Sequence, residues 1–195
     1  MIQIVIDDRG SIKAVQSILA SMPLKVKQVV RRASVDALRA VKAEIPRAVS
    51  ARYALTKSAV RSHMQVRQVS EDGGMRSGII VSGRKIPSID FDVQPKTPPP
   101  QQGVPVAKRT PIRITTIRGQ TKIGKPNRFI AQMRSGHIGV FMKKTPKSLP
   151  IRESMSESIR EMIRVKEIRK KIEDRASDVL TKSIQRNIKS VLEKP

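Results

Sequence analysis

The stretch from Ser156 to Leu192 constrains the fold of this chain more than any other, because it contains neither proline nor glycine. Its apolar residues recur mostly three and four positions apart, which is the pattern of an amphipathic α-helix. The spacing predicts one long helix or two helices in line. At about 1.5 Å per residue, such a helix can outrun a small β-layer. Its apolar stripe is therefore expected to pack either on the chain's own core or against a neighbouring subunit.

The N-terminal part of the chain is also predicted to be mainly helical. After an alternating strand over residues 1–6, the apolar residues follow a helical spacing from Ser11 to about Val49. Pro23 is expected to separate two helices in this range, and Pro46 to kink or end the second. Asp8, Arg9 and Gly10 are expected to form the turn that precedes them.

The middle of the chain is predicted to be rich in β-structure. Thr56 is suited to cap a short helix over residues 57–61. Short alternating segments predict strands at 64–69, 78–82, 86–93, 112–117, 129–133 and 138–142. The proline-rich segment 95–111 is expected to be an extended arm or a long loop.

These elements together predict an α+β fold. N-terminal helices and a long C-terminal helix are expected to pack on a mainly antiparallel β-sheet, with the proline-rich arm projecting from it. We expect a single domain over residues 1–195, made of a strand and helices (1–62), a β-rich region (63–155) and a C-terminal helix (156–195).

The core of this domain is predicted to be thin for its length. Only 2% of the residues are aromatic, and 38% are hydrophobic. A core built almost wholly from aliphatic residues and alanine leaves apolar surface that is expected to be buried against other subunits.

The charge is strongly positive and is concentrated in one segment. The net charge is +24, and no acidic residue lies between Asp92 and Glu153, a window that holds 13 lysines and arginines. Such a segment faces phosphates, a partner's carboxylates or open solvent. With few aromatic rings for base stacking, any nucleic acid is expected to be bound through its backbone, without sequence preference. The residues predicted to contact DNA or an acidic partner are Lys108, Arg109, Arg113, Arg118, Lys122, Lys125 and Arg128.

Several resemblances to catalytic or metal sites are weak. The segment from Gly119 to Lys125 matches most of a phosphate-binding loop, but Pro126 stands where a serine or threonine would hold magnesium, so a basic turn between strands is predicted instead. The carboxylate pairs Asp7–Asp8 and Asp90–Asp92 have no histidine at a suggestive spacing. The two histidines, His63 and His137, are far apart in sequence.

The composition argues against further classes. There is no cysteine, which excludes disulfides and thiolate chemistry, and no apolar run long enough for a membrane span. The N-terminal residues are not those of a signal peptide. We therefore expect neither an enzyme nor a metal or cofactor site, and no membrane partner.

One segment resembles a known family. The stretch from Arg128 to Phe141, RFIAQMRSGHIGVF, followed by Leu149-Pro150-Ile151, is similar to the hairpin of the prophage minor tail protein Z family. Tyr53-Ala54-Leu55-Thr56-Lys57 and the turn Ser82-Gly83-Arg84-Lys85-Ile86-Pro87 occur in the family's order. The resemblance extends over about Leu24 to Met162. It departs from the family at Met142-Lys143-Lys144, where an arginine is usual, and at Glu157-Ser158, where a Pro-Ser pair is common.

The resemblance implies a structural protein of a phage or prophage tail, located in the virion at the head-proximal neck and made in the host cytoplasm. Its implied role is tail completion or head–tail joining as a subunit of a homo-oligomeric ring, with six copies expected. The implied partners are tail terminator, tail tube or head–tail connector proteins, together with DNA passing through the neck. We expect the packing face of the hairpin to consist of Phe129, Ile130, Met133, Val140 and Phe141. The charge alone favours the alternative, a free, sequence-nonspecific nucleic-acid-binding protein.

Overall fold

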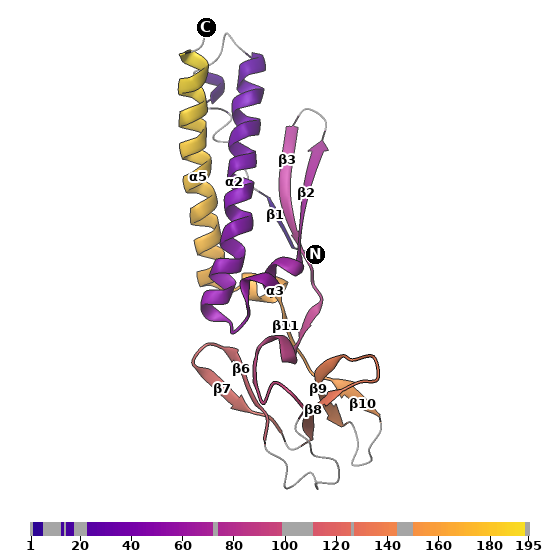
Figure 1. The fold of residues 1–195 in the computed structure, drawn as a ribbon. Coiled ribbons are helices and arrows are strands. Elements are labelled where there is room, and N and C mark those ends of the chain that lie inside the picture. The colour runs from indigo at the N-terminus through magenta and orange to yellow at the C-terminus, as the bar shows by residue number, and fades with distance from the viewer. Residues whose placement is uncertain are drawn as a thin grey trace.

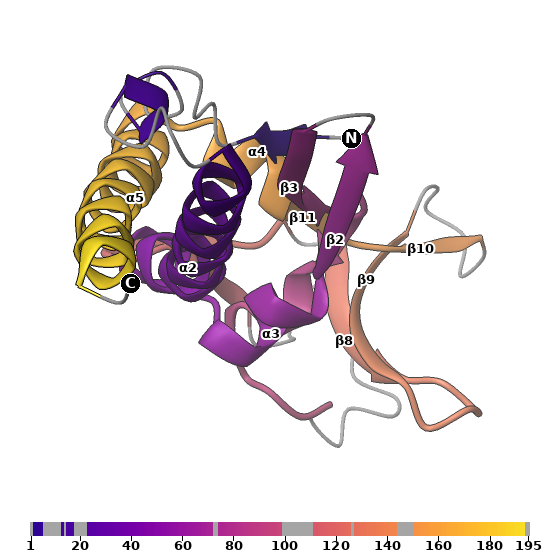
Figure 2. The same cartoon turned by 90° about the horizontal axis from the view of Figure 1, so that it is seen from above.

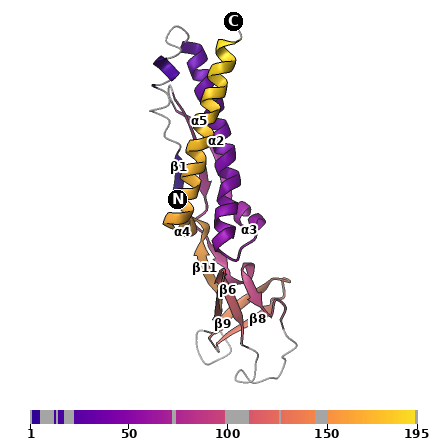
Figure 3. The same cartoon turned by 90° about the vertical axis from the view of Figure 1, so that its left-hand side faces the viewer.

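The computed structural model describes residues 2–5, 13, 15–17, 23–71, 74–98, 111–125, 127–143 and 150–193. These residues form an elongated body in which two long helices occupy one end and a β-rich half occupies the other (Figure 1). The same arrangement is seen from the side in Figure 3. The predicted α+β class is confirmed, because helices from both ends of the chain pack with antiparallel strands.

The two long helices pack side by side as an antiparallel pair. Helix α2 (Pro23–Arg52) begins at a proline, which is favoured in the first helical turn because its missing N–H would have no partner there. Pro46 lies inside α2, so the expectation that this residue ends the helix is wrong. Ile45 and Val49, on either side of it, are fully buried in the main core, and this packing holds the last turns in place. Helix α5 (Lys166–Leu192) runs back along α2.

The start of the C-terminal helical region differs from the prediction. Residues Met155–Ser158 form strand β11, and the short helix α4 (Ile159–Ile163) precedes α5. Ser158 caps α4: its Oγ accepts from the Glu161 amide at 3.3 Å, and the Glu161 carboxylate accepts from the Ser158 amide at 2.8 Å. This capping box fixes the helix start later than Ser156.

The antiparallel strands of the described residues are divided among four small sheets. Strands β1 (Ile2–Val5), β3 (Gly74–Val81) and β2 (Met64–Glu71) make a sheet in the order β1-β3-β2 beside α2, as Figure 2 shows. The predicted helix capped by Thr56 is present as α3 (Lys57–Ser62). The single strand expected over residues 86–93 is divided by a 3₁₀ turn, Ser88–Asp90, into β4 (Lys85–Pro87) and β5 (Asp92–Gln94).

The β-rich half contains the other three sheets. Strand β4 pairs with β11, and β5 pairs with β6 (Arg113–Ile117), which pairs with β7 (Gln120–Ile123). The last sheet has the order β10-β9-β8, from β8 (Arg128–Gln132), β9 (Ile138–Lys143) and β10 (Ile151–Glu153). Most of the predicted proline-rich arm, residues 99–110, lies outside the described residues.

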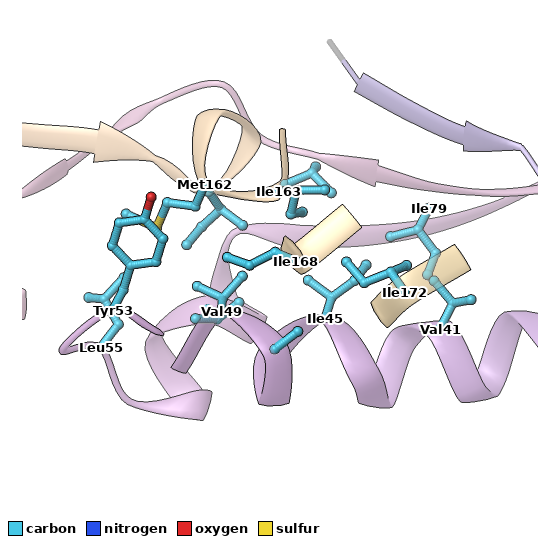
Figure 4. Packing of buried hydrophobic residues seen from close by; sticks show 14 of the residues in the cluster. Val41, Ile45, Val49, Tyr53, Leu55, Ile79, Met162, Ile163, Ile168 and Ile172 are labelled. Atoms are coloured by element: carbon cyan, nitrogen blue, oxygen red, sulfur yellow. The ribbon is translucent and has the colours of Figure 1, made fainter. Parts of the chain in front are cut away.

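Three separate clusters make up the core. The largest joins the second half of α2 to α4, the start of α5 and strand β3, and includes Ile45, Leu55 and Met162 (Figure 4). A narrower cluster lies between the outer halves of α2 and α5 and relies on small residues such as Ala33 and Ala37. The third cluster holds the β-rich half together. The core is therefore divided along the length of the molecule, with its largest part where α2, α4, α5 and β3 meet.

Tyr53 joins the two halves. Its ring is only 2% exposed, and its hydroxyl donates to Glu157 Oε2 at 3.2 Å. Burial, together with the adjacent Glu157 carboxylate, raises the pKa of this phenol. The backbone continues the junction, since the Ala54 amide donates to the Thr116 carbonyl at 2.9 Å.

Candidate functional site

The basic residues predicted to contact an anion lie in the β-rich half, around the β6–β7 hairpin. Arg113 lies on β6, Lys122 on β7 and Arg128 at the start of β8. Lys125 is an exposed residue between β7 and β8. Lys108 and Arg109 lie outside the described residues.

These cations do not form a single patch. In the β6–β7 register Arg113 lies opposite Ile123, and Ile114 lies opposite Lys122. Because successive residues of a strand point to opposite faces, Arg113 and Lys122 point to different sides of the hairpin. The structure thus brings the residues into one region without placing them on one surface.

Arg118 has a structural role in addition to its charge. Its Nε donates to the Ser50 carbonyl at 2.8 Å, and its amide donates to the Arg52 carbonyl, also at 2.8 Å. These two bonds attach the β6–β7 turn to the last turn of α2. Arg118 is therefore part of the junction between the two halves.

The segment that resembles a phosphate-binding loop is mostly a strand. Gly119, with φ +77°, is in the turn, and the next four residues form β7, whose side chains are all exposed. A phosphate-binding loop requires a helix N-terminus directly after it, whereas this segment leads to another strand, β8. The turn predicted here is thus limited to Arg118 and Gly119.

The residues expected to form one packing face of the β8–β9 hairpin are divided between its two sides. Ile130 lies opposite Val140, and both are buried in the core of the β-rich half. Phe129 lies opposite Phe141 on the other side, with ring centroids 6.3 Å apart. Met133 is half-buried at the end of the hairpin. The pleat of the strands causes this division.

His137 has a partner that the sequence analysis did not identify. Its Nε2 lies 2.8 Å from Glu153 Oε1, and its ring packs edge-on against Phe141, with centroids 6.3 Å apart. Gly139 lies between them: a β-carbon at this position would stand 2.8 Å from Glu153 Oε1 and 3.1 Å from the Phe141 ring. The glycine therefore leaves room for the carboxylate. The signal in the sequence was the alternation of His137, Gly139 and Phe141, which share one face of the hairpin.

Other titratable groups surround this pair. Burial raises the pKa of Asp90, His63 and His137 oppose this effect, and the Glu153 carboxylate adds to it. Asp92, in contrast, lies on β5 opposite Thr115. No group of three or more histidine, cysteine or acidic side chains is placed to hold a metal ion among the described residues. Asp7 and Asp8 are not among them.

Comparisons with known proteins gave no match: no family model, no curated protein and no solved structure is similar to this chain at a significant level. In the part of the chain that the structure describes, no helix is both long and apolar enough to cross a membrane.

Proposed function

We propose that this chain is a structural subunit of a phage or prophage tail, a tail-completion or head–tail joining protein that forms a ring at the neck. The observation that carries the proposal is the elongated shape of the described residues, whose buried apolar side chains are divided among three separate clusters. An elongated body with a divided core leaves more surface for contact with other subunits than a compact monomer of 21.8 kDa would.

Open strand edges support the same proposal. Strand β7 is an edge of its sheet, all its side chains are exposed, and Ile123 is 69% exposed. Monomeric proteins commonly shield such edges, because unpaired backbone groups beside an apolar side chain recruit another strand. In a ring of identical subunits, one surface of each copy contacts a different surface of the next, and β7 is available for such a contact.

The segment that resembles minor tail protein Z supports a structural role. Gly139 and the His137–Glu153 pair tie the hairpin turn to β10, and Ile130 and Val140 anchor its other face in a core cluster. The residues of the resemblance are therefore accounted for by packing. The partners that we propose are further copies of the chain, six in a ring, neighbouring tail terminator, tube or connector proteins, and the DNA in the neck.

Immunogold electron microscopy of purified virions tests this proposal. Antibody against the full-length chain is expected to label the neck, and light scattering of the purified chain is expected to show a mass that rises with concentration. Label absent from the particles, combined with a chain that stays monomeric at all concentrations, would refute the proposal. If that monomer bound DNA tightly, the result would favour a free nucleic-acid-binding protein.

A further inference from the structure

The antiparallel pair of helices α2 and α5 has a basic face that is distinct from the predicted anion-contact residues of the β-rich half. On α2, Lys25, Arg32 and Arg39 recur every seven residues and therefore lie along one stripe. On α5, Lys182, Arg186 and Lys189 form a similar stripe at spacings of four and three. All six residues are exposed. We call these six residues the basic face.

A hydrogen-bond network shows that the two stripes adjoin. Asp36, which lies between Arg32 and Arg39 on α2, accepts from Ser183 Oγ and from an Arg186 guanidinium nitrogen, both at 2.6 Å. Because the helices are antiparallel, this crossing places Arg32 close to the level of Lys189 and Arg39 close to the level of Lys182. The face therefore has cations on both helices at two levels, about 10 Å apart along the axes.

Little on these helices neutralises the face. In sequence, α2 has no acidic residue from Pro23 to Val35, and α5 has none from Val179 to Leu192. Asp36 pairs with Arg186 at 2.6 Å and with Arg39 at 4.0 Å, and Glu193 pairs with Lys189 at 3.6 Å. These two carboxylates leave most of the charge of the six cations unbalanced. Among the described residues, the ion pairs do not include Lys25, Arg32 or Lys182.

This arrangement disfavours the isolated helices, which indicates a role in binding. Lys182 and Arg186 are like charges four residues apart, a spacing at which they repel. Basic residues near the start of α2 also oppose its helix dipole. The first half of α5 is different: there Arg169 pairs with Glu173 at 2.7 Å, and Glu167 pairs with Arg52 of α2. Charge is thus segregated along the same helix.

We infer that the basic face binds the phosphate backbone of a nucleic-acid duplex. Two cationic rows on helices packed about 8–10 Å apart can both reach the phosphates of a duplex, which carries one negative charge per about 1.7 Å of its axis. Helices α2 and α5 include no aromatic side chain. The basic face therefore contacts the nucleic-acid backbone and has no sequence preference. The inference does not depend on the tail-protein proposal.

Fluorescence anisotropy of the full-length chain with a labelled duplex of about 20 base pairs, from about 50 to 200 mM salt, tests this inference. One variant combines Arg32→Gln, Arg39→Gln and Lys182→Gln. A matched control, Lys166→Gln, Lys170→Gln and Lys171→Gln, removes three exposed charges from the balanced half of α5. The basic-face variant is expected to lose on the order of 100-fold in affinity near 0.1 M salt and about 2 to 3 from the slope of log affinity against log salt. The control is expected to lose less than about 3-fold.

Three outcomes would overturn the inference. The first is an equal loss in both variants, which would mean that only net charge matters. The second is poly-glutamate competing as well as unlabelled duplex, which would identify an acidic protein as the partner. The third comes from a variant that keeps the charge, Arg32→Lys with Arg39→Lys and Lys182→Arg. It is expected to bind like the native chain, and a large loss there would contradict backbone recognition.

Discussion

Replacing Gly139 with alanine tests whether the hairpin is held by the packing of Glu153 over a glycine. A β-carbon at position 139 would lie 2.8 Å from Glu153 Oε1, closer than non-bonded atoms approach, and 3.1 Å from two carbons of the Phe141 ring. The carboxylate must therefore move away, and its 2.8 Å contact with His137 is lost. Phe141 is 6% exposed, so its ring has little room to shift.

The expected loss of unfolding free energy in Gly139→Ala is the sum of three contributions. Losing the half-exposed His137–Glu153 bond costs about 0.5–1.5 kcal/mol, and crowding the Phe141 ring costs about 1–3 kcal/mol. Alanine restricts the unfolded chain and returns about 0.4–1 kcal/mol. The net loss of unfolding free energy is about 2 kcal/mol, which for a chain of this size lowers Tm by about 4–8 °C.

The assay is urea unfolding of the full-length chain, followed by circular dichroism, with Gly83→Ala as the control. At Gly83 the added β-carbon would meet only Arg160, at 3.7 Å or more, which is ordinary contact. This control is expected to be neutral or slightly stabilising. The cost of Gly139→Ala is also expected to shrink by about 1 kcal/mol in a Glu153→Ala background, where the carboxylate is already gone. A loss below about 0.5 kcal/mol, or a loss unchanged in that background, would refute the reasoning.

Three further predictions concern other parts of the molecule. Hydrogen bonds from Ser158 lower the pKa of Glu161 below its ordinary value of 4.5, so its contribution to stability is present at neutral pH and is lost as the pH falls through the lowered pKa; urea titrations of native and Glu161→Gln chains should therefore differ at pH 7 and converge in acid. Asp36→Ala removes the acceptor of Ser183 and Arg186 and should lower the unfolding free energy by about 1 kcal/mol. Because it also removes an acid from the basic face, it should raise duplex affinity severalfold in the anisotropy assay, and unchanged or weaker binding would count against that face. Ile123→Lys should leave the unfolding free energy within about 0.5 kcal/mol and weaken self-association in sedimentation experiments; equal association would exclude β7 as a contact.

Local sequence signals located the secondary structure well where one local rule dominates. Thr56 capped its helix as predicted, and the alternating segments around Phe129 and Phe141 became paired strands. Pro46 does not end its helix, one of the two outcomes predicted for it, because burial of its neighbours outweighs the loss of one hydrogen bond. The start of α4 was misplaced because strand pairing of Met155 with Pro87 depends on a partner distant in sequence.

The candidate site was harder to predict, because its contacts join residues far apart in the chain. The acid-free window was visible in the sequence, but strand register, which places Arg113 and Lys122 on opposite sides, was not. Glu153 lies outside the segment from Arg128 to Phe141 that resembles the tail protein family. Only the pairing of β10 with β9 brings it to His137. The charged and titratable residues could thus be listed from the sequence, but which of them lie together could be seen only in the structure.

The basic face shows why a count of charges along the sequence is a poor guide to a binding surface. The acid-free window from Asp92 to Glu153 carries the larger total charge, yet its strands place cations such as Arg113 and Lys122 on different faces. The stretches around Arg32 and Arg186 are separated by about 150 positions, and each is unremarkable by itself. Antiparallel packing of α2 and α5, through Ala33, Ala37, Leu180 and Ile184, places them side by side. The hydrogen bonds of Asp36 to Ser183 and Arg186 show the register in which the two helices align. Because apolar packing also sets this register, Asp36→Ala removes an acid from the basic face without separating the two cationic rows.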